Sequence, residues 1–392
     1  MPVARDFSAD ILDPVSKQIV NNVGVWVDKE VRPNASEFEH NDEFPEPLLK
    51  GMSDMGLFGI KIPEKYGGLD LSFECYAGVC VELARGWMSL AGIINTHVLV
   101  GYAINEYGTE AQKDYYLPKF VEPEMRCALS ITEPDAGSDA QAIKTQAKRD
   151  GDDYVINGQK MWVTNGHRAG VYLVMTKTDM TANPRHKGIT AFLVPHETPG
   201  FIKGKKFDKL GYKGVETTEL SFEDARVPAS AVLGGKEGSG FQQIMSALEV
   251  GRINVAARGV GLAQAAFDDS IRYAQKRAAF GVPIIQHQAQ QIRLAEMAVK
   301  IRAARLLTFD AARKKDAGER SDLDAGIAKL FATEIANECA LDAMRIHGGV
   351  AYSKDLPIER YYRDAPLMII AEGTSDIQKI VITRSMMKDY PV

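Results

Sequence analysis

The apolar pattern of the chain changes period twice, and this change limits the architecture more than any other feature. Residues 9 to 124 follow mainly the three- and four-residue spacing of buried helix faces, including a proline-free run from 81 to 113. Residues 125 to 232 contain short β-rich runs, and helical spacing returns after Gly234 and Gly235. A chain of 392 residues also exceeds the ~250–300 residues that one core usually spans. We therefore predict an α+β multidomain protein: helical residues 1–124, β residues 125–236 and helical residues 237–392.

Two Asn-Gly pairs punctuate the β region. Asn157-Gly158 follows the run from Tyr154 to Ile156, and Asn165-Gly166 follows the run from Met161 to Thr164. Tight hairpin turns need positive φ at both central residues, which Asn and Gly tolerate. The pattern predicts a hairpin at each pair, with further strands over residues 171–175, 189–194 and 217–222.

The last third of the chain is typical of long helices. Residues 241 to 277 form one helical pattern. Ser321 and Asp324 have the spacing of a capping box, in which a hydroxyl and an acid satisfy N–H groups at a helix start. The helix that begins there is expected to end at Gly348 and Gly349.

Composition excludes several classes of function. The formal net charge is −5, so the chain lacks the basic surface on which bulk binding to nucleic acid depends. No stretch approaches ~18 uninterrupted apolar residues, and we expect no transmembrane segment. The four cysteines are scattered and residues 1–7 do not resemble a signal peptide. A reducing, cytoplasmic location is expected.

Common catalytic motifs are missing. The sequence contains no GxxxxGK[ST], GxSxG or HExxH segment. The glycine cluster from Gly234 to Gly240 lacks GxGxxG spacing, and the seven histidines show no paired ligand spacing, so we predict no metal site.

Two polar segments remain as candidates for chemistry. Residues 129–139 form a loop rich in small hydroxyl residues and backbone N–H groups, which can approach a planar heterocycle or a phosphate, although a plain turn explains it equally well. In residues 370–379, Glu372 directly precedes Gly373, Thr374 and Ser375 after an apolar approach. Taken alone, this acid could simply stabilise a helix N-terminus.

Together with other segments, these motifs resemble the acyl-CoA dehydrogenase family. The segments that carry the resemblance stand in family order between residues ~82 and 384: ITEPxxGSD at 131–139, NGQKMWVTNG at 157–166, RxxFG at 277–281, His287-Gln288, Arg363-Asp364-Ala365 and EGTSDIQ at 372–378. The resemblance implies an N-terminal helical domain, a middle β-barrel or sandwich and a C-terminal four-helix bundle. It also implies a homotetramer, bound FAD and electron-transfer flavoprotein as electron acceptor.

The resemblance assigns roles residue by residue. Thr132 would bond the polar edge of the flavin ring, Trp162 would pack on that ring, Thr164 would lie near flavin N5, and Arg277 would pair with the pyrophosphate from a neighbouring subunit. Residues 157–166 would form a hairpin that covers the flavin. The other expected cofactor contacts are Leu129, Ile131, Gly137, Ser138, Phe280, Gln288, Arg345, Gly348, Gly349, Thr374 and Asp376. Arg345 departs from the Gln, Asp or Glu that the family usually has there.

The same resemblance assigns the reaction. Glu372 would remove the Cα proton of an acyl-CoA thioester, while a hydride leaves Cβ for flavin N5. The backbone N–H of Glu372 and a ribityl hydroxyl would polarise the thioester carbonyl. The expected substrate contacts are Ser138, Glu249, Arg252 and Gly373.

Several alternatives stay open. Trp162 could be sheet core, Arg277 a solvated cation, and Glu249 with Arg252 a simple i,i+3 ion pair. Ala371 and Gly251 are small beside the base, which suggests a branched, cyclic or ring-bearing acyl group, and residues 86–102 contain no Arg or Lys for a second carboxylate. An acyl-CoA oxidase, another flavoenzyme on this fold, or a catalytically silent acyl-CoA or flavin scaffold are the competing functions.

Overall fold

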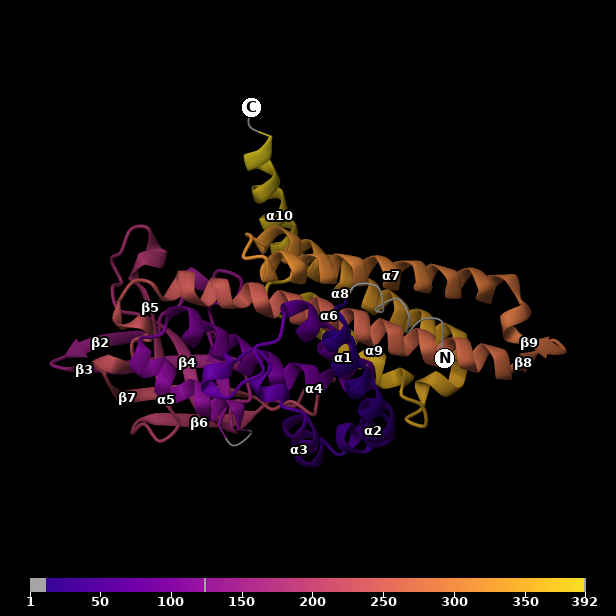
Figure 1. Cartoon of the computed structure of the whole chain (residues 1–392), viewed down its shortest axis with the longest axis horizontal. Helices are drawn as coiled ribbons and strands as arrows, with labels where there is room; N and C mark the ends of the chain where they lie inside the picture. Colours follow the sequence, from indigo (N-terminus) through magenta and orange to yellow (C-terminus); the bar gives the residue numbers. More distant parts are fainter. Residues whose placement is uncertain (1–11, 123–124, 391–392) are drawn as a thin grey trace.

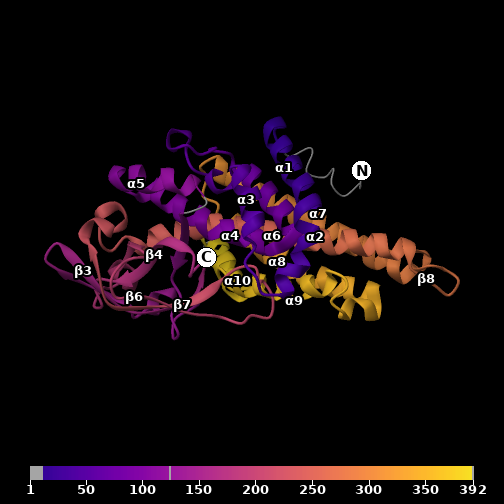
Figure 2. The same ribbon diagram turned by 90° about the horizontal axis from the view of Figure 1, so that it is seen from below.

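The computed structural model describes residues 12–122 and 125–390, which form helices, then a sheet, then helices again. The molecule is elongated, with the strands at one end and the tip of the long helices at the other (Figure 1). A view from below shows the same separation, with the sheet curled on itself (Figure 2). The predicted helical–β–helical architecture is confirmed. The expected boundary at residue 124 falls on residues 123–124, outside the described part of the chain.

The N-terminal helices surround one long buried helix. A π-helical turn over Val27–Val31 joins the first two of them. Their bounds are α1 (Pro14–Trp26), α2 (Arg32–His40), α3 (Glu46–Asp54), α4 (Phe73–Tyr107) and α5 (Glu110–Val121).

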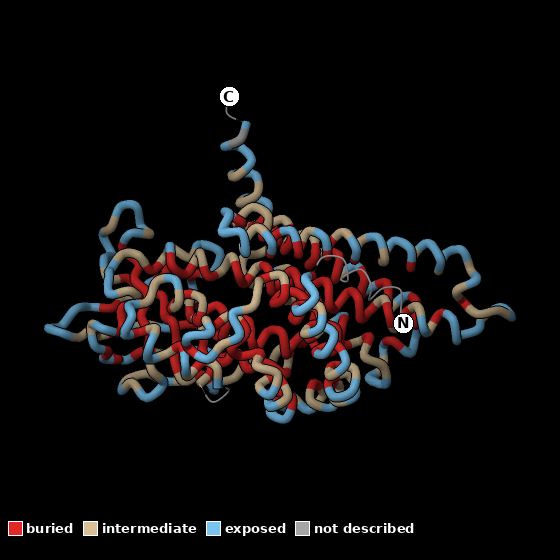
Figure 3. Tube along the Cα trace, viewed as in Figure 1, coloured by how far each residue is buried: buried red, intermediate tan, exposed pale blue. Residues whose placement is uncertain are grey.

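Helix α4 is the centre of the core. By length and composition it could cross a membrane, but 94% of its apolar window is buried inside the protein, which is typical of a core helix (Figure 3). The proline-free run from 81 to 113 is helical, but it is divided between two helices at Gly108. The Thr109 side chain accepts a bond from Gln112 N at 3.2 Å, and the Gln112 side chain accepts one from Thr109 N at 3.0 Å, so a capping box starts α5.

The middle region is one seven-stranded sheet in the order β1-β4-β2-β3-β7-β6, with β5 paired to β4. Its inner face carries a separate apolar core that includes Tyr154, Tyr172, Phe192 and Phe222. The strands are β1 (Arg126–Ser130), β2 (Gln146–Asp150), β3 (Asp153–Thr164), β4 (Ala169–Lys177), β5 (Ile189–Pro195), β6 (Phe201–Lys206) and β7 (Thr217–Pro228).

The two predicted hairpins are wrong. Strand β3 runs straight through Asn157 and Gly158, which form a bulge there, because Asn157 exchanges two hydrogen bonds with Asp224 across the sheet, at 3.0 and 2.9 Å. Asn165 does turn the chain, with φ of 60°, but β3 and β4 pair with other strands instead of each other within the described sheet. The Asn165 amide donates to the carbonyls of Ile93 on α4 and Cys127 on β1, so this turn fastens the sheet to α4.

The last third forms the predicted helices. Helix α6 packs between α4 and α8, and Gly259 and Gly261 permit the close approach, since a Cβ there would lie 2.6 Å from Ala332 O and 2.3 Å from Val81 O. The elements are α6 (Gly240–Lys276), β8 (Ala278–Ala279), β9 (Val282–Pro283), α7 (Gln288–Asp316), α8 (Asp322–His347), α9 (Ile358–Ile370) and α10 (Ser375–Asp389).

Helix α8 begins and ends where expected, but not for the expected reason at its start. Ser321 makes no capping hydrogen bond. The Asp324 carboxylate instead accepts a bond from Lys314 Nζ at 2.6 Å, so the predicted capping box is wrong. Gly348, with φ of 65°, ends the helix as predicted.

Candidate active site

Glu372 lies in the short connection between α9 and α10. It adopts a left-handed φ of 53° and Gly373 follows at 88°, so two successive residues turn the chain sharply. The Thr374 hydroxyl then accepts a bond from Ile377 N at 3.2 Å and caps α10. The alternative of a first-turn helix acid is therefore wrong for Glu372, because that position belongs to Asp376, which pairs with Lys379 at 3.1 Å.

The carboxylate of Glu372 has one oxygen bound and one bare. Oε1 accepts bonds from Asn95 Nδ2 on α4 at 2.5 Å and from Arg258 Nη2 on α6 at 3.2 Å. Oε2 is buried without a hydrogen-bond partner among the described residues. A Cβ on Gly251 would lie 2.1 Å from Oε2, so the small residue there leaves room for the carboxylate itself.

Two buried cations, Arg258 and Lys329, and the half-buried Arg252 lie around this carboxylate. Arg258 is 3% exposed and also donates to the Tyr212 hydroxyl at 3.1 Å. Lys329 on α8 donates to the Gly373 carbonyl at 2.8 Å, and burial lowers its pKa to about 8 despite the nearby charge of Glu372. Burial also lowers the pKa of Arg252, which lies one turn from Glu249.

Glu249 and Arg252 do not form the i,i+3 ion pair that was considered. Glu249 pairs with Lys315 on α7 at 3.3 Å, and the Nε of Arg252 is buried without a partner among the described residues. Both residues stay candidates for the substrate passage, since α6 also carries Gly251 against Glu372.

A second group of predicted residues gathers on the sheet. The Thr132 carbonyl accepts a bond from Met161 N at 2.8 Å, and β3 bulges next to that contact. The bulge gives Trp162 a φ of 59° and leaves its ring 57% exposed, stacked on Phe207 with 4.4 Å between centroids. Residues 157–164 therefore belong to a bulged strand and residues 165–166 to the turn after it, so the predicted hairpin is wrong. Trp162 is exposed and is not sheet core.

A buried ion pair fixes this loop from beneath. Lys160 Nζ lies 2.8 Å from Glu133 Oε1 and also donates to the Ile131 carbonyl at 2.9 Å. Glu133 in turn accepts bonds from the N–H groups of Lys144 and Thr145, at 2.6 and 3.0 Å. Burial lowers the pKa of Lys160 to about 8 against the attraction of Glu133.

The remaining predicted residues of this group flank the loop. Leu129 and Thr164 lie half-buried in strands, whereas Gly137 and Ser138 are exposed, and a Cβ on Gly137 would meet nothing within 4 Å. An exposed aromatic ring beside an open, polar loop fits a flat heteroaromatic group with a hydrogen-bonding edge. This fit rests on Thr132, Gly137, Ser138 and Trp162.

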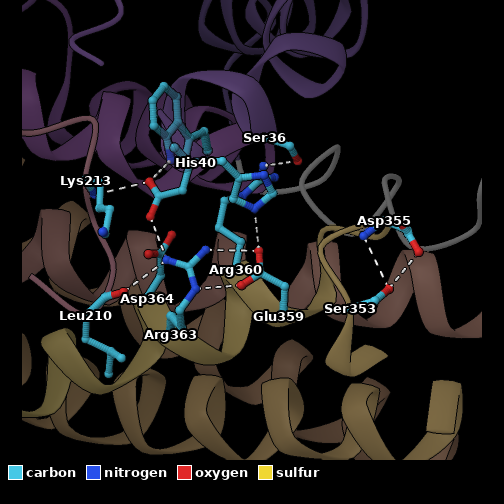
Figure 4. Close-up of polar contacts among 12 residues, drawn as sticks. Ser36, His40, Leu210, Lys213, Ser353, Asp355, Glu359, Arg360, Arg363 and Asp364 are labelled. Carbon is cyan, nitrogen blue, oxygen red and sulfur yellow. Dashed lines mark hydrogen bonds and ion pairs between the residues drawn. The ribbon is translucent and has the colours of Figure 1, made fainter. Parts of the chain in front are cut away.

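The chain between β6 and β7 connects the two groups. Phe207 stacks on Trp162, while the Tyr212 hydroxyl bonds to Arg258 beside Glu372. Polar contacts hold this segment on α9 and α2: Tyr212 N donates to Asp364 at 2.6 Å, and Lys213 N donates to Glu39 at 3.1 Å. Arg363 also donates to the Leu210 carbonyl at 3.1 Å (Figure 4). Burial, reinforced by Glu39, raises the pKa of Asp364.

The other predicted cofactor residues lie far away in the same chain. Arg277 and Phe280 belong to the tip at β8 and β9, at the opposite end of the molecule from the sheet (Figures 1 and 2). Phe280 is 97% exposed, and Arg345 pairs with Asp342 at 2.9 Å. Arg277, Phe280, Gln288, Arg345, Gly348 and Gly349 all face solvent.

Sequence reasoning missed Asn95, Arg258 and Lys329. Each lies in a helix whose neighbours are mostly apolar, and each is buried. A lone amide or cation within a buried helical stretch was the available signal, because buried polar groups need a partner.

The comparisons with known proteins bear on the whole chain. Models of the N-terminal, middle and C-terminal domains of acyl-CoA dehydrogenase match residues 13–124, 128–225 and 238–387. The chain belongs to the acyl-CoA dehydrogenase family. Its members oxidise or reduce a CH–CH bond next to a thioester, so the chain is an oxidoreductase of that kind.

Two curated relatives illustrate the range of the family. A 3-(aryl)acrylate reductase of Clostridium sporogenes is 40% identical over 365 residues, 93% of this chain and 96% of that protein. The mitochondrial short-chain specific acyl-CoA dehydrogenase of Bos taurus is 40% identical over 367 residues, 93% of this chain and 88% of that protein.

Solved structures of acyl-CoA dehydrogenases have the same fold as this chain. Butyryl-CoA dehydrogenase from Megasphaera elsdenii superposes with a TM-score of 0.93 at 36% identity, covering 96% of this chain and 99% of that one. A glutaryl-CoA dehydrogenase from Mycobacterium smegmatis in complex with FADH2 has a TM-score of 0.90 at 30% identity, with 96% of each chain covered.

Proposed function

We propose that Glu372 is the base in the FAD-dependent α,β-dehydrogenation of an acyl-CoA thioester, and that the acyl group is branched, cyclic or ring-bearing. The observation that carries the proposal is the Glu372 carboxylate, which has a bare Oε2 while Oε1 is bound by Asn95 and Arg258. A carboxylate with one free, buried oxygen can accept a proton from carbon within hydrogen-bond reach.

The residues divide the work as follows. The left-handed turn at Glu372 and Gly373 fixes the backbone from which the base projects, and we assign the Glu372 N–H to the thioester carbonyl, where such a donor is worth ~2.7–4 kcal/mol. Bound FAD supplies the hydride acceptor. Thr132, Ser138, Trp162 and Thr164 would hold its ring from the sheet side.

The choice of acyl group rests on Ala371, a small residue directly before the base. Gly251 no longer supports it, since the space beside Gly251 holds the Glu372 carboxylate. The relative named 3-(aryl)acrylate reductase is consistent with a ring-bearing acid in this part of the family.

We further propose a homotetramer in the cytoplasm with electron-transfer flavoprotein as acceptor. Support for the oligomer comes from the flavin residues at the far tip and from exposed Ile292, Val299 and Leu306, which repeat every seven residues along α7. Support for a reducing compartment comes from four free, buried cysteines.

The test is a panel of acyl-CoA thioesters scored by anaerobic flavin bleaching. We expect the highest kcat/KM with cyclic or ring-bearing acyl groups, and Glu372→Gln should keep FAD and ligand while losing at least ~10²-fold of the rate. A clear preference for a medium or long linear chain overturns the substrate class. Full turnover in the Glu372→Gln enzyme overturns the assigned base, and rapid oxygen consumption without another acceptor identifies an oxidase.

A further inference from the structure

Two polar side chains lie deep in otherwise apolar helices and meet at one atom. Asn95 is 3% exposed on α4 and Arg258 is 3% exposed on α6. Both donate to Glu372 Oε1, at 2.5 and 3.2 Å, and neither bonds to Oε2. Donors on two helices therefore bind the same oxygen, and Oε2 has no hydrogen-bond partner among the described residues.

The placement of Arg258 is itself fixed. Its Nη1 donates to the Tyr212 hydroxyl at 3.1 Å, and Tyr212 N is held by Asp364 at 2.6 Å. The Tyr212 hydroxyl fills the space where a side chain on Gly92 would project, since a Cβ there would overlap with it. A buried guanidinium needs an anion to offset its desolvation, and the closest contact to one is Glu372.

We propose that Arg258 and Asn95 are positioning residues for Glu372: they bind Oε1, fix the orientation of the carboxylate and direct Oε2 at the substrate carbon. The catalytic part rests on the proposed function, whereas the fixed orientation of Glu372 does not. Two donors on one oxygen, one of them charged, restrict the rotation of the carboxylate.

Other charged groups face the carboxylate from the elements packed around it. Arg252 lies on α6 with Glu249 and Asp322 nearby, Lys329 lies on α8, and Tyr212 lies on the segment before β7. On α4, Tyr76 and Cys80 face Arg258. Among these groups Arg258 alone forms an ion pair with Glu372 within the described residues. Arg258 is therefore the charged donor whose removal tests the positioning of Glu372.

The decisive experiment follows the carboxylate directly. Holoenzyme labelled with carboxyl-¹³C glutamate is measured by infrared spectroscopy, and the difference from Glu372→Gln isolates the carboxylate stretching bands of Glu372. In Arg258→Met these bands should shift, because Oε1 loses a charged hydrogen-bond donor. Arg258→Lys should recover part of the shift. Arg305→Met, which removes another buried arginine, on α7, should leave the bands unchanged.

Activity supplies the second readout. Arg258→Met and Asn95→Leu should lower kcat at least tenfold with little change in KM. Unchanged infrared bands of Glu372 in Arg258→Met overturn the proposal, and so does a kcat equal to that of the wild type. If no thioester bleaches the flavin of the wild type, yet the bands shift in Arg258→Met, the proposed function is overturned and the positioning stands.

Discussion

At the scale of single residues, the site concentrates charge where the chain is otherwise apolar. Lys329 has no exposed side-chain surface and bonds only a carbonyl, Gly373 O, among the described residues. Burial lowers its pKa to about 8 from 10.5. The free-energy cost of burying this cation should make stability depend on pH at the contact between Lys329 on α8 and the Gly373 carbonyl.

This cost gives a pH-dependent prediction. Below pH 8 both the folded and unfolded forms carry the Lys329 proton, so the wild type bears the full penalty relative to Lys329→Met. Between pH 8 and 10.5 the folded form loses the proton first, so the unfolded state binds more protons and wild-type stability rises, by on the order of 3 kcal/mol. Urea titrations of both proteins from pH 7 to 10 measure the difference.

The matched control is Lys50→Met, which removes an exposed lysine. Its stability difference from the wild type should stay flat over the same range. A flat difference for Lys329→Met as well would show that Lys329 remains charged throughout.

The sequence allowed the acid Glu372 to be singled out, together with the loop around Thr132 and the aromatic Trp162. It did not allow Asn95 and Arg258 to be found, because their meeting at Oε1 depends on α4 and α6 packing together from positions more than 160 residues apart. Far contacts of this kind leave only a weak local signal, a polar residue in an apolar helix.

At the scale of elements, the helices were predictable and the strand connections were not. The local spacing of apolar residues predicts α6 and α8. Asn157, however, lies within a strand because it bonds to Asp224 on β7. Asp324 pairs with Lys314 and does not take part in a capping box. Gln112 shows the same rule. Its side chain caps α5 and also bonds the segment that joins the sheet to α6.

Gln112 should therefore matter more than an ordinary cap. Its Nε2 donates to the carbonyls of Ser230 and Val232, at 2.8 and 2.7 Å, and its Oε1 accepts from Gly234 N at 3.0 Å. Gln112→Ala should lower the free energy of unfolding by about 2–4 kcal/mol, because buried groups lose their partners. Thr109→Ala should cost about 1 kcal/mol as the loss of a cap. Chemical denaturation measures both losses of unfolding free energy. Equal losses in the two variants would show that Gln112 contributes only as a helix cap.

At the scale of the whole molecule, the residues that the resemblance assigns to the cofactor lie at two ends of the chain. Trp162 and Thr132 belong to the sheet region, whereas Arg277 and Gln288 belong to the elements at the far tip (Figure 1). The proposed assembly would bring such residues together from two copies. The order of the motifs in the sequence does not indicate this separation.

Interrupting the apolar repeat on α7 tests this arrangement. Val299 is 70% exposed at the centre of the repeat, and Val299→Glu should dissociate the assembly because a charge would be buried between copies. Light scattering after gel filtration should report monomers or dimers, with flavin lost from the purified protein. Met180→Glu alters an exposed residue near the sheet and should leave assembly and flavin content unchanged. A Val299→Glu protein that remains tetrameric with full flavin content would contradict the proposal that the apolar repeat on α7 lies between copies.

The central position of α4 also bears on how the chain is made. Its apolar surface is complete at Tyr107, yet the helix that covers much of it, α6, begins only at Gly240. During translation the apolar surface of α4 therefore lacks its α6 partner while the whole sheet is synthesised. We expect chaperones at the ribosome to protect the apolar surface of α4 during that interval. The N-terminal helices complete their core only after the last third of the chain has been synthesised.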